Sequence, residues 1–217
     1  MTERVKTRRY DSTRRRAQAA STRREILDAA QRLFEARGYA ATTIAAVAAE
    51  AKVAEKTVYV AFETKSGLLR ALWNLRLRGD ETDIPVGERP WYREVLDEPD
   101  AARQLRLTAY NSRLVKLRVA GLMEVIRTAA PADPDIAALW SRIQTDFHAN
   151  QRAIVASLAE KNALRPDVSV DRGADILWTL NHPDVWHLLV RERGWSPEEY
   201  EQWLGDAASA ELLDRTR

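Results

Sequence analysis

Apolar residues recur along this chain at helical spacing, and glycines and prolines separate the periodic segments. The first clear apolar face consists of Ile26, Ala30, Leu33 and Phe34. A capping-box pattern at 22–25 precedes this face, and Gly38 follows it as a natural residue to end a helix. The pattern predicts a first helix over residues 22–37.

Two shorter apolar faces follow. The first is formed by Ile44, Val47, Ala48 and Ala51, and the second by Val58 and Phe62. Residues 52–54 separate the two faces and place the apolar Val53 in the turn. Two helices of about two turns joined by about three residues are typical of a helix-turn-helix. Two short amphipathic helices are also typical of ordinary packing units, so this pattern alone leaves both interpretations open.

The later segments also have helical periodicity and are bounded by capping residues, glycine or proline. The predicted helices cover residues 65–78, 100–116, 118–128, 134 to about 161, 169 to 193 with an interruption at Pro183, and 197 onward. Gly121 lies near the expected junction of the helices over 100–116 and 118–128, and residues 79–90 are expected to form a polar loop. Because no alternating β pattern is present, we predict an all-α fold of about nine helices.

The composition is that of an ordinary globular protein. The 217 residues are 45% apolar and 30% charged, and no apolar run approaches the roughly 20 residues that a spanning helix needs. There is no cysteine, which excludes disulfides, thiolate metal sites and cysteine nucleophiles and suits a reducing compartment. No apolar stretch follows the first basic residues, so we expect no secretory signal and a cytoplasmic location.

Charge is distributed unevenly along the chain. Residues 1–80 contain 17 Lys and Arg against 9 Asp and Glu, whereas residues 81–217 contain 17 against 23. The basic excess is concentrated near the N-terminus, where residues 1–20 form a predicted arm that includes Arg14, Arg15 and Arg16. A basic first third indicates a polyanionic partner. A solvated charged tail is the competing interpretation of such an arm.

Residues 22–72 resemble the DNA-binding domain of the TetR family of transcriptional regulators. The resemblance rests on Gly38-Tyr39, Thr42-Thr43-Ile44, Val47-Ala48, Ala51-Lys52-Val53-Ala54, Thr57-Val58-Tyr59, Phe62 and Lys65-Ser66-Gly67-Leu68-Leu69. Residues 174–189 and 193–200 are similar, less specifically, to the C-terminal half of such proteins. The resemblance implies a helix-turn-helix DNA-binding domain over 21–78 and a helical effector-binding and dimerisation domain over 79–217.

Contacts to double-stranded DNA are predicted on both short helices. With Val58 and Phe62 inward, the recognition helix directs outward Glu55, Lys56, Thr57, Tyr59 and Val60. Lys56 is a candidate donor to a guanine edge. Phosphate contacts are expected from Thr42 and Thr43 at a helix N-terminus and from the arm, and the resemblance adds Lys65. Simple N-capping by the threonines and half-buried packing of Tyr59 are the competing interpretations.

Three residues depart from the family pattern in this region. Lys52 replaces a turn glycine, so the turn either avoids the left-handed conformation or accepts strain. Ala54 replaces a serine, which removes an N-cap and a phosphate contact, and Ala61 stands where an aromatic residue or histidine is common. Fewer contacts from the recognition helix would leave more of the affinity to Lys56, Lys65 and the arm.

The resemblance also implies an apolar effector cavity and a homodimer that binds a palindromic operator. Side chains predicted to surround a small-molecule effector are Tyr110, Leu114, Met123, Trp140, Phe147 and Trp178, with Asn111, His148 and Asn181 as candidates to orient its polar group. The dimer interface is predicted from the stripes Ile176, Leu180, Leu188, Trp203, Ala207, Ala210 and Leu213. Ordinary intramolecular core is the competing interpretation of both sets.

Catalysis is not expected. His182 and His187 lie five residues apart with Pro183 between them, a spacing unsuited to a zinc-binding helix, and no phosphate-binding glycine loop or nucleophile elbow is present. We therefore predict neither a metal site nor a cofactor. The leading hypothesis is a TetR-type repressor released from its operator by a small apolar or amphipathic effector. The alternative is a DNA-binding co-regulator or architectural protein whose C-terminal half binds a protein partner and no small molecule.

Overall fold

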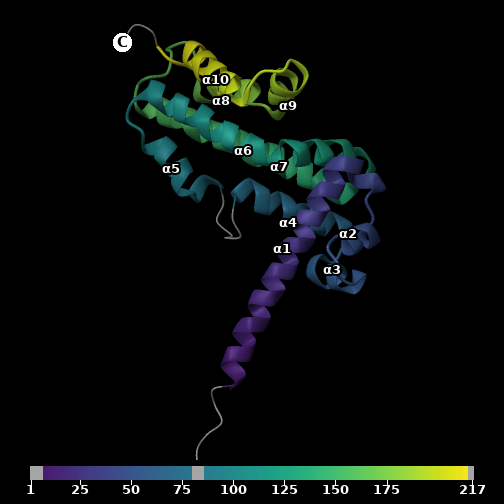
Figure 1. The fold of residues 1–217 in the computed structure, drawn as a ribbon. Coiled ribbons are helices and arrows are strands. Elements are labelled where there is room, and N and C mark those ends of the chain that lie inside the picture. The colour runs from purple at the N-terminus through teal and green to yellow at the C-terminus, as the bar shows by residue number, and fades with distance from the viewer. Residues whose placement is uncertain (1–6, 80–85, 215–217) are drawn as a thin grey trace, which may run out of the picture. The chain divides into compact units, whose positions relative to one another are not determined.

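The computed structural model describes residues 7–79 and 86–214, which form helices and contain no β-strand within these ranges (Figure 1). Two compact units divide the chain, one ending at Asn74 and the other beginning at Leu75. The first unit contains α1 (Thr7–Ala41), α2 (Ile44–Glu50), α3 (Glu55–Phe62) and the start of α4 (Lys65–Arg78). The second contains the rest of α4, η1 (Val86–Glu88), α5 (Pro90–Asp97), α6 (Ala101–Ala129), η2 (Ala130–Ala132), α7 (Pro134–Glu160), α8 (Val170–Leu180), α9 (Pro183–Trp186), the π-helical η3 (His187–Glu192) and α10 (Pro197–Leu212). The predicted all-α fold is confirmed.

Helix α1 begins about four turns earlier than predicted. Thr22 lies inside the helix, so its capping-box pattern does not mark a helix start. The preceding segment is rich in Arg and Ala, which favour helix, and it contains no Gly or Pro to stop the helix from extending back to Thr7. This stretch forms a rod that projects away from α2 and α3 (Figure 1). Residues 1–6 of the predicted arm lie outside the described residues.

A tight turn joins α2 to α3. Lys52 adopts φ 55° there, so the turn accepts the left-handed conformation that the missing glycine would have favoured. The Val53 amide donates to Ala48 O at 2.9 Å, which closes the end of α2. After α3, Gly67 packs against the chain so closely that a Cβ there would lie 2.3 Å from Phe62 O. Glycine is therefore required where α4 begins.

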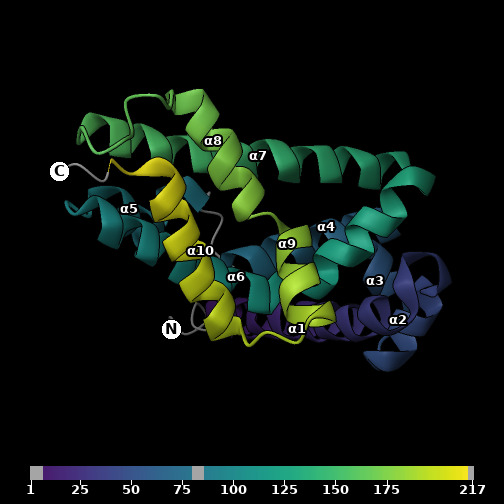
Figure 2. The same cartoon turned by 90° about the horizontal axis from the view of Figure 1, so that it is seen from above.

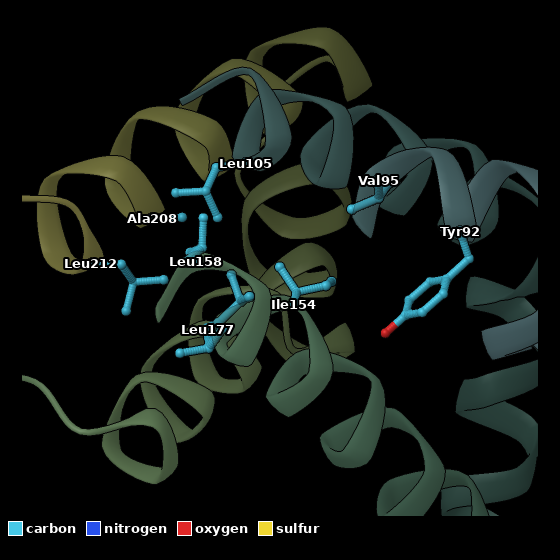
Figure 3. Packing of buried hydrophobic residues seen from close by; sticks show 9 residues of the cluster. Tyr92, Val95, Leu105, Ile154, Leu158, Leu177, Ala208 and Leu212 are labelled. Carbon is cyan, nitrogen blue, oxygen red and sulfur yellow. The ribbon is translucent and has the colours of Figure 1, made fainter. Parts of the chain in front are cut away.

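The second unit is organised around the long helices α6 and α7. Helix α8 packs along α7, and α10 packs across α6 (Figure 2). Their shared core is apolar, with Leu105 of α6, Leu158 of α7 and Leu177 of α8 directed toward one another (Figure 3). From α10, Ala208 and Leu212 complete this cluster.

The predicted break between residues 116 and 118 is wrong, and one helix was missed. Residues 101–129 form one helix that runs through Gly121, because an exposed glycine costs only about 1 kcal/mol and the packing on both sides outweighs it. Of the loop expected over 79–90, residues 80–85 lie outside the described residues and Val86–Glu88 form η1; helix α5, which was not predicted, begins at Pro90 and buries Tyr92 and Val95.

The caps read from the sequence are confirmed where local chemistry decides them. Asp133 accepts from the amides of Asp135 and Ile136 at the start of α7. Ser169 caps α8. Ser196 forms a complete capping box with Glu199 at the start of α10.

Candidate nucleic-acid interface and effector region

Helix α3 presents one exposed face and one buried face. Val58 and Phe62 are buried in the first unit, and the five residues predicted to face DNA are all exposed, namely Glu55, Lys56, Thr57, Tyr59 and Val60. Tyr59 is 50% exposed and Val60 is 77% exposed. Large apolar side chains left in solvent on so short a helix indicate a surface that contacts another molecule.

The two threonines before α2 have different environments. Thr43 is exposed, and its hydroxyl accepts from the Ala46 amide at 3.1 Å, so it is the N-cap of α2. Thr42 is 0% exposed, and its hydroxyl donates inward, with Leu33 O at 3.1 Å and Gly38 O at 2.8 Å. A hydroxyl held in this way does not reach a phosphate, so the phosphate contact predicted for Thr42 is wrong. The contact of the exposed Thr43 stays a prediction.

Lys65 contacts the end of α1. Its ammonium donates to Tyr39 O at 2.9 Å and lies 4.2 Å from the centroid of the Tyr39 ring. This contact uses one of its three N–H donors, and the others remain for a phosphate. Thr64, which sequence reasoning missed, caps α4 by accepting from the Gly67 amide at 2.9 Å, and its hydroxyl lies 2.9 Å from that of Ser66.

The basic residues of α1 fall into two groups. Arg14, Arg15 and Arg16 are exposed on the projecting part of the helix. Arg23 instead donates to Ala61 O at 2.9 Å, and its guanidinium lies 4.3 Å from the centroid of the Phe62 ring. A cation at the C-terminal end of α3 stabilises that end of the helix. Arg23 therefore supports the position of α3.

The predicted effector side chains come from α6, α7 and α8. Those that are partly buried are Leu114, Met123, Trp140, Phe147 and Trp178. Tyr110 is 43% exposed and lies beneath the guanidinium of Arg113, so its predicted place in an internal cavity is wrong. The Trp178 ring packs at 4.7 Å from His182 and 6.3 Å from His148, which is 3.0 Å from an Asp175 carboxylate oxygen.

A buried amine lies between these helices, and sequence reasoning missed it. Lys116 of α6 is 6% exposed, and its ammonium donates to Ser112 Oγ at 2.6 Å and to the side-chain oxygen of Asn181. Asn181 is also buried; it accepts from Ser112 and donates to Gln151 of α7 at 3.3 Å. From α10, the Tyr200 ring centroid lies 5.2 Å from the Lys116 nitrogen. Burial lowers the pKa of Lys116 to about 7.

The stripe predicted for dimerisation divides between core and surface. Ile176, Leu180 and Leu213 are partly buried against the core of the second unit, and Leu188 is half exposed. On α10, Trp203, Ala207 and Ala210 are partly buried, and Trp203 packs against a second core cluster that includes Tyr200. They line an open groove of about 570 Å³ together with Trp195, Glu199, Gln202 and Asp206.

Within the described residues, no cluster of three or more acidic or histidine side chains is arranged to hold a metal ion. None of the helices described is both long and apolar enough to cross a membrane.

Residues 26–72 match the profile of the family described as bacterial regulatory proteins, tetR family. The match covers the buried part of α1, all of α2 and α3, and the first part of α4. It therefore includes the exposed face of α3. A curated relative, the probable HTH-type transcriptional regulator ArpR of Pseudomonas putida, is 26% identical over 74% of this chain and 77% of its own length.

Solved structures share the fold over most of the chain. A putative transcriptional regulator from Saccharomonospora viridis in complex with choline gives a TM-score of 0.69 at 20% identity and covers 90% of this chain and 100% of its own. SmeT in complex with triclosan gives 0.68 at 18% identity, with 90% and 93% covered. SmeT is described as the repressor of a Stenotrophomonas maltophilia multidrug efflux pump.

Proposed function

We propose that the chain is a DNA-binding transcriptional repressor of the TetR family, which acts as a homodimer and is released from a palindromic operator by a small apolar or amphipathic effector. Its relatives are named as transcriptional regulators, so the alternative of an architectural co-regulator that binds no small molecule is not favoured. The proposed domains are the arm over 1–20, the DNA-binding domain over 21–78 and the effector domain over 79–217.

The observation that carries this function is the exposed face of α3. Its five outward side chains contribute nothing to the core, whereas Val58 and Phe62 on the opposite side are buried. We assign the base-reading role to Lys56, because a lysine on such a face donates to guanine O6 or N7 in the major groove. Tyr59 and Val60 are suited to a thymine methyl group.

Phosphate contacts would position α3 without selecting bases. Thr43 supplies a hydroxyl at the N-terminus of α2, and Lys65 supplies a cation at the start of α4. The exposed Arg14, Arg15 and Arg16 add charge along the projecting part of α1.

Effector control requires a ligand that prefers one of two conformations of the dimer. Triclosan and choline are bound by structurally similar proteins, which supports a small-molecule role for the second unit here. We expect the effector to favour a conformation in which the two recognition helices no longer match successive major grooves. The partly buried apolar stripe of α10 that lines this groove, with Trp203, is the proposed interface with a second copy.

Selection of duplexes from a random pool by the full chain tests the function. We expect enrichment of palindromic sites whose half-sites lie one helical turn or a multiple of it apart. Lys56→Ala is the matched variant, because it changes one exposed side chain of α3 and none of the core. Enrichment of single, non-repeated sites would contradict the homodimer, and no enrichment would contradict operator binding itself.

A further inference from the structure

The buried Lys116 has no acidic partner in the described part of the chain. The elements packed around it contribute neutral oxygens and nitrogens, from Ser112 on α6, Gln151 on α7 and Asn181 after α8. The charged or titratable groups that face it are Tyr200 from α10 and His182 from the loop after α8. Neither is an anion at neutral pH, since burial raises the pKa of Tyr200 far above its usual value.

His182 does not supply the missing charge either. Burial lowers its pKa, a nearby Asp184 raises it and Lys116 lowers it further. Asp184 lies 3.5 Å from the His182 ring and is exposed, so its charge is directed to that histidine and to solvent. An ammonium taken out of water without a counter-ion is costly, and buried charges in proteins are normally paired. Lys116 is therefore a buried amine with no anion among the described residues, so that an anion able to hold its charged form would have to come from elsewhere.

Buried polar atoms without partners lie on the same three helices. They are Gln104 Nε2 and Asn111 Nδ2 of α6, Gln144 Oε1 of α7 and Trp178 Nε1 of α8, of which Gln104 lies beside Lys161 and away from Lys116. Arg152 pairs with Asp171 and His148 with Asp175, and this antiparallel register between α7 and α8 brings Gln144 opposite Trp178. Trp178 in turn packs on His182, which faces Lys116. The Tyr200 hydroxyl is also buried and lies beside Ser112.

We propose that the effector is an amphipathic acid whose carboxylate binds the Lys116 ammonium and whose apolar part lies along Trp178 and its partly buried neighbours on α6 and α7. Lys116 keeps one N–H donor after its bonds to Ser112 and Asn181, and the Tyr200 hydroxyl is a second donor. The unpaired Trp178 and Asn111 N–H groups can donate to further oxygens. This inference rests on the proposed function, because it names the class of the effector.

The geometry makes binding and protonation of Lys116 interdependent. A carboxylate bound to the amine stabilises its charged form and raises its pKa from about 7. At about pH 8 the free amine is mostly neutral, so each bound acid should bring a proton with it. An uncharged molecule of the same shape has no such requirement.

Calorimetry on the full chain tests the proposal with two matched pairs of probes, decanoate with 1-decanol and 2-naphthoate with 2-naphthalenemethanol. At pH 7 we expect at least one acid to bind about tenfold or more tightly than its alcohol, as a charge-assisted hydrogen bond allows. At pH 8, titration in two buffers of different ionisation enthalpy should show uptake of close to one proton per subunit with the acid and none with the alcohol.

Variants separate the amine from the rest of the unit. Lys116→Met, or Lys116→Gln if the first does not fold, should abolish both the preference for the acid and the proton uptake. Lys161→Met is the control, because Lys161 is a partly buried lysine of the same unit that donates to Leu96 O, Glu98 O and Gln104. It should keep both. Thermal unfolding of each variant verifies that it is folded.

Three results would overturn the proposal: equal affinity for acid and alcohol, proton uptake that persists without Lys116, or no binding of either acid below about 1 mM. These measurements use the protein without DNA. Failure of operator selection would therefore contradict the proposed repressor function, whereas failure of calorimetry with intact operator binding would contradict only the acidic effector.

Discussion

The exposed arginines of α1 allow a quantitative test of how the protein binds DNA. Changing Arg14, Arg15 and Arg16 together to Gln removes three positive charges from the projecting part of the helix and leaves Arg23, which supports α3, in place. Each phosphate contact that is lost makes the slope of log K against log salt shallower by about 0.9. Three contacts correspond to about 2.7 per subunit and about 5 per dimer, and partial engagement would give half of this.

Fluorescence anisotropy with a labelled operator measures this slope. When salt rises from about 50 to 200 mM, a slope that is shallower by about 5 means that the variant loses about 10³-fold less affinity than the wild type. The ranking of operator sequences should not change, because phosphate contacts carry no base information.

A second triple variant controls for net charge. Arg142, Arg172 and Arg191 are exposed in the second unit, and their change to Gln removes the same charge from another surface. This control should leave the slope nearly unchanged. Equal effects of the two triple variants would mean that overall charge acts at a distance, and an unchanged slope in the α1 variant would refute the assignment of phosphate contacts to the arm.

Three further predictions concern base selection, assembly and pH. Lys56→Ala should cost about 1–3 kcal/mol of operator binding and relax preference at one base position per half-site, whereas Lys65→Ala should weaken all sequences equally; uniform losses for both in a binding-site selection would make Lys56 another phosphate contact. Trp203→Glu should shift the chain toward monomer in sedimentation and weaken operator binding with it, so a dimer that resists this change places the interface elsewhere. Burial lowers the pKa of Lys116 from 10.5 to about 7. Between these two values the amine is protonated in the unfolded chain and neutral in the folded protein, so the free energy of unfolding rises with pH in this window. Lys116→Met should thus raise the midpoint of thermal unfolding more at about pH 6 than at about pH 9, and equal shifts would contradict the charge penalty.

Features set by neighbouring residues were predictable from the sequence, and features set by distant contacts were not. Asp133 and Ser196 were identifiable as caps because a cap is formed by a side chain and amides two or three residues away. Thr22 has the same local pattern, yet the residues before it continue the helix, and a cap needs a helix start as well as a capping residue. The exposed face of α3 followed from the period of its two buried residues.

The buried amine shows where sequence reasoning ends. A lysine in a helical segment is expected to be exposed, and Lys116 carries no local mark of burial. Its environment depends on Asn181, 65 residues further along the chain, and on Tyr200, further still. The prediction for Tyr110 was wrong for the complementary reason. Its aromatic ring was expected to be inside, but it is 43% exposed and lies beneath the guanidinium of Arg113. Which side of α6 faces inward is decided by α10, and one sequence does not reveal that pairing.

The division of α3 into a buried and an exposed face bears on how operator preference can change during evolution. Arg23 is bonded to Ala61 O and lies on Phe62, and Val58 is buried, so the contacts that hold this helix involve none of its exposed positions Glu55, Lys56, Thr57, Tyr59 and Val60. Surface substitutions away from core features usually change stability by no more than about 0.5 kcal/mol. Mutations at these positions can therefore accumulate in a gene duplicate without unfolding the protein, and a lineage can explore new operators by neutral drift. Transplanting the same short segment between relatives should succeed wherever an arginine and an aromatic residue occupy the equivalents of Arg23 and Phe62.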